Sequence, residues 1–89
     1  MRLLSLTFPS NKRAEQCSEA EQVRKVAEEA GEFLAAATSG AGDPIEEAID
    51  TMIALDGWLD KQPEEEVRAA ISMVRRKGTE RGDWEVRDD

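Results

Sequence analysis

The chain has 89 residues, a formal net charge of −8 and no histidine. At this length we expect a single domain with a marginal core, because so short a chain buries only about 60% of its unfolded surface. The acidic balance argues against nucleic-acid binding, which usually requires a basic face, and equally against an anionic membrane surface. One cysteine, Cys17, and the lack of an apolar run near about 20 residues predict a cytoplasmic protein without disulfides or membrane spans.

The N-terminal segment does not read as a helix. Residues 3–8 alternate loosely between apolar and polar side chains, which predicts a short strand or an extended arm. Pro9 ends this alternation, and Lys12 and Arg13 follow it. These two cations belong either to a solvated arm or to a phosphate contact. We expect residues 1–16 to form an arm ahead of the helical part of the chain.

The first predicted helix begins near Ser18, which together with Glu21 fits the capping-box pattern. Apolar side chains then recur at helical spacing and form one stripe. The stripe consists of Val23, Val26, Ala27, Ala30, Phe33, Leu34 and Ala37. The turn-rich segment 38–42 should end this helix.

Two further helices are predicted after that turn. Asp43 suits the N-cap and Pro44 the first position of the second helix. Its apolar side chains are Ile45, Ala48, Ile49, Met52, Ile53 and Leu59. The third helix is predicted over about 64–77, with an acidic first turn and a basic last turn that complement the helix dipole. Gly78 is the expected C-cap, so residues 79–89 are predicted to form a C-terminal tail.

Each of the first two predicted helices carries a pair of acids three residues apart, Glu29 with Glu32 and Glu47 with Asp50. Residues at this spacing are neighbours on one helix face. The stretch between the pairs can hold a helix end, a turn and a helix start, which predicts an antiparallel hairpin. Four carboxylates brought together repel one another, so we expect a divalent cation between them. Mg²⁺, or alternatively Mn²⁺, suits such a set of hard oxygen ligands.

The order E-x-x-E, spacer, E-x-x-D resembles the signature of the MazG-like all-α nucleoside triphosphate pyrophosphohydrolases, especially their small phage or bacterial forms. It stands here as Glu29-Ala30-Gly31-Glu32 and Glu47-Ala48-Ile49-Asp50. The resemblance covers roughly residues 22–84. It implies an all-α fold in which a helical hairpin plus a third helix assembles into an oligomer with a four-helix-bundle core, as a homodimer or homotetramer.

The resemblance also implies a reaction, the Mg²⁺-dependent hydrolysis of a (deoxy)nucleoside triphosphate to the monophosphate and pyrophosphate. Glu29, Glu32, Glu47 and Asp50 would hold the metal. Related proteins act on phosphoribosyl-ATP, dUTP or dCTP. This chain lacks the longer aromatic-bearing loops with which some relatives grip a base, which leaves the base preference open.

Five charged residues are candidates for substrate binding or general-base catalysis. Lys77 and Arg81 match the downstream lysine and arginine that contact phosphates in the family, and they would offset charge on the departing pyrophosphate. Lys25 lies between Glu29 and Glu32 in angle around the helix and is a further candidate for substrate binding. A carboxylate that contacts a water can act as general base. Glu32 and Glu28 are the candidates, and the sequence does not choose between them.

The alternative is a protein without catalytic activity. Residues 1–89 would then form a single helical interaction or regulatory module, or an inactive member of the family. This reading explains the amphipathic helices equally well. It leaves the paired acids, Lys77 and Arg81 unexplained.

Overall fold

The computed structural model describes residues 12–83, and over this range the chain is helical with no strand. The helices are α1 (Lys12–Gln16), α2 (Glu19–Ser39), α3 (Pro44–Leu59) and α4 (Glu64–Arg81). The predicted all-α class and the helical hairpin are confirmed, whereas the strand or extended arm predicted over residues 3–8 lies outside the described range. None of the described helices is long and apolar enough to cross a bilayer.

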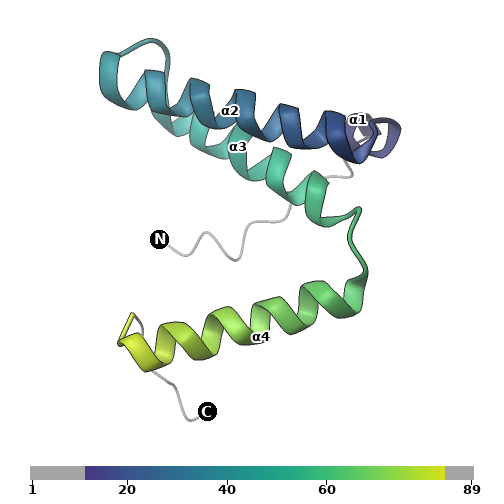
Figure 1. Ribbon diagram of the computed structural model, residues 1–89. Coiled ribbons are helices and arrows are strands. Elements are labelled where there is room, and N and C mark those ends of the chain that lie inside the picture. Colours follow the sequence, from purple (N-terminus) through teal and green to yellow (C-terminus); the bar gives the residue numbers. More distant parts are fainter. Residues whose placement is uncertain (1–11, 84–89) are drawn as a thin grey trace.

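Helices α2 and α3 form a hairpin (Figure 1), and a polar side chain caps the start of each helix. The Ser18 hydroxyl accepts the backbone N–H of Glu21 at 3.1 Å, and the Glu21 carboxylate accepts the Ser18 N–H in return. Gly40 ends α2 in the left-handed conformation at φ 75°, which glycine adopts without steric cost. Asp43 then caps α3 by accepting the N–H of Ile45 at 2.9 Å. Both predicted helix starts are therefore correct.

The buried residues of the hairpin of α2 and α3 are small or polar. Ala36 and Ala54 are each 4% exposed and form the buried apolar core of the described chain. Gln22 is 2% exposed, and its side-chain Nε2 donates to the carbonyl of Ala54 at 2.8 Å. Small side chains allow the two helices to approach closely, and the Gln22 bond fixes their register. No large apolar side chain in this range is fully buried.

Helix α4 is longer than the sequence indicated. The predicted C-cap at Gly78 is wrong, because α4 continues to Arg81 and ends at Gly82, which has φ 76°. Gly78 lies inside the helix, where glycine costs roughly 1 kcal/mol relative to alanine, and one further turn of hydrogen bonds offsets that cost. The predicted tail from residue 79 is corrected accordingly. Lys77 and Arg81 lie four residues apart on one helix face.

The predicted N-terminal arm also contains a helix. Residues 1–16 were expected to be an arm, yet α1 occupies Lys12–Gln16 and packs against α3, so the described chain has four helices rather than three. Beside it, the Lys61 ammonium donates to the carbonyl of Cys17 at 2.7 Å. A helix of little more than one turn has no stable nucleus of its own. It depends on contacts with α3, which no local pattern reports.

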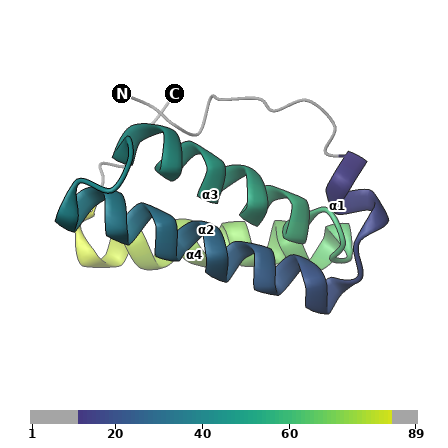
Figure 2. The same ribbon diagram turned by 90° about the horizontal axis from the view of Figure 1, so that it is seen from above.

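Helix α4 is separated from the hairpin in Figure 1, and Figure 2 shows that it runs in roughly the same direction as the hairpin helices. Its apolar side chains are largely uncovered, with Ile71 46% and Val74 57% exposed. Apolar residues of the hairpin are exposed as well, among them Leu34 at 59% and Ile45 at 74%. The described helices therefore leave several large apolar side chains exposed to solvent.

Candidate metal centre

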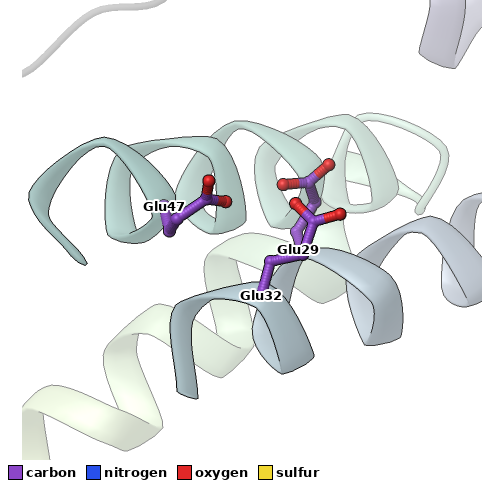
Figure 3. Close-up of side chains that lie close together, drawn as sticks. All are labelled: Glu29, Glu32 and Glu47. Atoms are coloured by element: carbon purple, nitrogen blue, oxygen red, sulfur yellow. The ribbon is translucent and has the colours of Figure 1, made fainter. Parts of the chain in front are cut away.

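Three of the four predicted metal ligands converge between α2 and α3. Glu29 and Glu32 project from α2 toward Glu47 on α3 (Figure 3). Each of the three offers a carboxylate oxygen, and these oxygens all lie within 4.8 Å of one another. Glu29 is buried, Glu47 is half-buried and Glu32 is exposed. The cluster therefore has a buried side toward the hairpin contact and an accessible side at Glu32.

Asp50, the fourth predicted ligand, stands beside this group rather than within it. Asp50 follows Glu47 by three residues on α3 and is exposed. It lines an open groove together with Glu29, and its negative charge acts on Glu47. The acid pair on α3 thus places one carboxylate inside the cluster and one at its edge.

The carboxylate of Glu47 shows how strongly these acids act on one another. Burial raises the pKa of Glu47 above its ordinary value, and a hydrogen bond with Glu32 and the charges of Glu32, Asp50 and Glu29 raise it further. In the absence of a cation, the site therefore makes Glu47 easier to protonate than an exposed glutamate. A divalent cation would reverse this effect by stabilising the ionised carboxylates.

Two oxygens of the cluster are left unsatisfied. Glu29 Oε2 and Glu47 Oε2 are both buried, and neither has a hydrogen-bond partner among the described residues. Leaving buried carboxylate oxygens unpaired is costly. Hard oxygen donors of this kind are the ligands that Mg²⁺ and Mn²⁺ prefer. The residues present therefore fit a divalent cation.

Lys25 holds the other oxygen of Glu29. Its ammonium lies 2.8 Å from Glu29 Oε1 and 3.9 Å from Glu28 Oε2. The Glu29 side chain is only 10% exposed, so this pair is screened less than a surface ion pair. With Oε1 held by Lys25, the second oxygen of Glu29 is the one without a partner.

An open groove of about 540 Å³ adjoins the cluster. It extends from Glu29 and Asp50 toward Cys17 and Glu21 at the start of α2, and Ile53 on α3 also lines it. Glu29 follows Glu21 by eight positions on α2, which corresponds to about 12 Å along the helix axis. The volume falls within the range of about 300–1,000 Å³ that is usual for small-molecule sites.

The groove includes some of the predicted site residues and not others. Lys25 and Glu28 line it, while Lys77 and Arg81 do not. Arg81 instead lies 3.1 Å from the carboxylate of Asp83 at the end of α4. Arg24 also lines the groove, although it was not among the residues predicted for the site. The sequence signal that could have indicated it is its position next to Lys25 and one turn from Glu28, on a helix that carries an acid pair.

The raised pKa of Glu47 predicts a pH dependence for the stability of the metal-free protein. Because the folded state binds the Glu47 proton more tightly than the unfolded state does, protonation of Glu47 stabilises the fold. This stabilisation is complete below the ordinary glutamate pKa of about 4.3. It is lost as the pH rises through the higher pKa of the folded state. We therefore expect metal-free Glu47→Gln to melt above the wild type at neutral pH, with the difference shrinking toward about pH 4. Thermal denaturation of both proteins across this range would contradict the assignment if their difference did not change with pH.

Comparison of the chain with protein-family models, curated proteins and solved structures finds no match in any of the three. The family resemblance is therefore carried by the two acid pairs and the downstream cations alone.

Proposed function

We propose that the protein hydrolyses a (deoxy)nucleoside triphosphate to the nucleoside monophosphate and pyrophosphate, with Mg²⁺ or Mn²⁺ held by Glu29, Glu32 and Glu47 and assisted by Asp50. The observation that carries the proposal is the convergence of three carboxylates from two helices, with two buried oxygens unsatisfied. A triphosphate is a substrate whose charge requires such a metal site, and the adjoining groove is large enough to hold a small ligand.

When bound, the metal would polarise phosphate oxygens and stabilise the charge that develops on them. In the proposed reaction a water oxygen attacks the α-phosphorus. The bond from that phosphorus to the α–β bridging oxygen breaks, and pyrophosphate leaves with the bonding electrons. The proton of the attacking water passes to a carboxylate. Glu28 suits this step, because it lines the groove next to the cluster without belonging to it, and Glu32 is the alternative.

Metal dependence provides the first test of this proposal. Hydrolysis of nucleoside triphosphates should appear with Mg²⁺ or Mn²⁺, disappear in excess EDTA and return when the metal is restored. Electron paramagnetic resonance should show Mn²⁺ binding to the protein in the absence of nucleotide. Turnover that persists in EDTA would contradict a metal-dependent mechanism.

We further propose that a second copy of the chain covers the exposed apolar surface, giving a homodimer or a homotetramer with a four-helix core. Ile71 and Val74 share one face of α4 and are 46% and 57% exposed. Ile71→Asp and Val74→Asp should each shift the protein toward monomers at micromolar concentration in analytical ultracentrifugation. Ala69→Asp, on the opposite side of α4, should leave the assembly intact. A wild type that is a folded monomer at this concentration would refute the proposal.

The exposed apolar side chains of α4 also favour a second candidate, a helical interaction or regulatory module without catalytic activity. That module would assemble through α4 and turn over no nucleotide. The Glu47→Gln substitution distinguishes the two functions. It should leave the assembly of such a module unaffected, whereas it should abolish the turnover of an enzyme.

A further inference from the structure

Two cations of α2 line the groove beside the carboxylate cluster. Arg24 and Lys25 lie in the same groove wall as Glu28, and the groove reaches Glu29 and Asp50 at its cluster end. Lys77 and Arg81, the cations that the sequence favoured for phosphate binding, do not line it. The hairpin therefore has its own positive charges next to the candidate metal centre.

The charge balance of the groove limits what can bind there. Four acids line it, Glu21, Glu28, Glu29 and Asp50, against the two cations. A bare anion would be repelled by this excess of negative charge. An anion that arrives with a divalent cation would not, because the metal would be taken by the carboxylates and the anion by the cations.

The two cations differ in how they are held. Lys25 is 2.8 Å from Glu29 Oε1 and 33% exposed, so its ammonium is close to the metal cluster. Arg24 is exposed and lies one turn from Glu28. A guanidinium presents a planar fork of donors that matches two phosphate oxygens, which makes Arg24 the better suited of the pair to grip a phosphate.

We propose that this groove is a phosphate-binding site for a metal-complexed pyrophosphate group, with Arg24 as its principal contact and Lys25 as the second. The proposal rests on the proposed function, since it assigns the phosphate chain of the same substrate to the α2 side of the metal centre. Arg24 is then a specificity-determining residue for phosphate, supplied by the hairpin itself and independent of α4.

Calorimetric titration with inorganic pyrophosphate in Mg²⁺ tests the assignment. The wild-type protein should bind, and Arg24→Ala should weaken binding about ten-fold or more. Arg24→Lys should be impaired as well, because an ammonium does not reproduce the fork. Arg68→Ala is the matched control, since Arg68 is exposed on α4, pairs with Glu64 at 2.6 Å and does not line the groove. This control should bind pyrophosphate as the wild type does.

The binding experiment tests pyrophosphate binding in the groove independently of triphosphate hydrolysis. Equal affinities of Arg24→Ala and Arg68→Ala, or no pyrophosphate binding by the wild type, would overturn the groove assignment. Binding by the wild type that is unchanged without Mg²⁺ would overturn it too, because the acidic lining should then repel the anion. A wild type that hydrolyses triphosphates while Arg24→Ala binds pyrophosphate normally leaves the proposed function standing. A wild type that binds through Arg24 but hydrolyses nothing removes the proposed function and retains the site.

Discussion

Glu47→Gln should abolish metal-dependent hydrolysis, lowering turnover by about a thousand-fold or more, as expected when a metal ligand of a hydrolytic site is lost. Glu47 is the member of the cluster supplied by α3, and its Oε2 is buried without a hydrogen-bond partner. Glutamine keeps the size of the side chain and removes its charge. The fold should be retained, and circular dichroism together with steady-state kinetics and Mn²⁺ titration would measure both effects.

Three companion variants sharpen this result. Glu46→Gln removes an exposed acid from the neighbouring position of α3 and should leave turnover unchanged. Glu28→Gln should retain Mn²⁺ binding and still lose about a hundred-fold in turnover, if Glu28 is the general base. Glu32→Gln should lose metal affinity as well as turnover, because Glu32 belongs to the carboxylate cluster. Normal turnover by Glu47→Gln would remove Glu47 from the site.

Lys77→Ala and Arg81→Ala should each lower kcat/KM by about ten- to a thousand-fold while leaving the fold intact. Both lie on one face of α4, because the helix extends through Gly78 to Arg81. As phosphate ligands, the role that the family resemblance implies, they would neutralise the pyrophosphate end of the substrate from the side opposite the carboxylates. This requires α4 of the same chain or of a second copy to close over the groove, whereas Figure 1 shows α4 apart from the hairpin of α2 and α3.

A purely structural role for these cations gives a different result. Exposed charges near a helix C-terminus stabilise by only about 0.3–1 kcal/mol, so the alanine variants would then change the melting temperature slightly and leave the kinetics alone. Arg75→Ala is the control, since it removes an exposed arginine from the opposite side of α4. Arg81→Lys should remain impaired, because lysine does not form a bidentate contact. Unchanged kinetics in both alanine variants would end their assignment to phosphate binding.

Local patterns in the sequence were sufficient for much of the fold. Ser18 and Asp43 cap the helices they were expected to cap, because an N-cap depends on side chains within a few residues of one another. The predicted end of α4 was wrong because local patterns offered two possible caps. Gly78 and Gly82 are four residues apart, both are suitable caps, and the energy of the extra turn decides between them.

Tertiary contacts account for what the sequence did not reveal. Gln22 is buried because its amide reaches Ala54 on the other helix, 32 positions away in the chain. Arg24 lines a groove only because Ile53 and Asp50 on α3 complete the lining. The spacing of the acid pairs predicted four converging carboxylates, and three of them do converge. It did not indicate that Asp50 would stand at the edge of the cluster, since that depends on how α3 packs on α2.

The most direct test is a product analysis for the purified protein with a panel of nucleoside and deoxynucleoside triphosphates in Mg²⁺, using anion-exchange chromatography and a coupled assay for pyrophosphate. We expect at least one triphosphate to yield its monophosphate and pyrophosphate in equal amounts, with Glu47→Gln inactive on the same substrate. Release of diphosphate and inorganic phosphate, or no turnover of any triphosphate, would contradict a pyrophosphohydrolase.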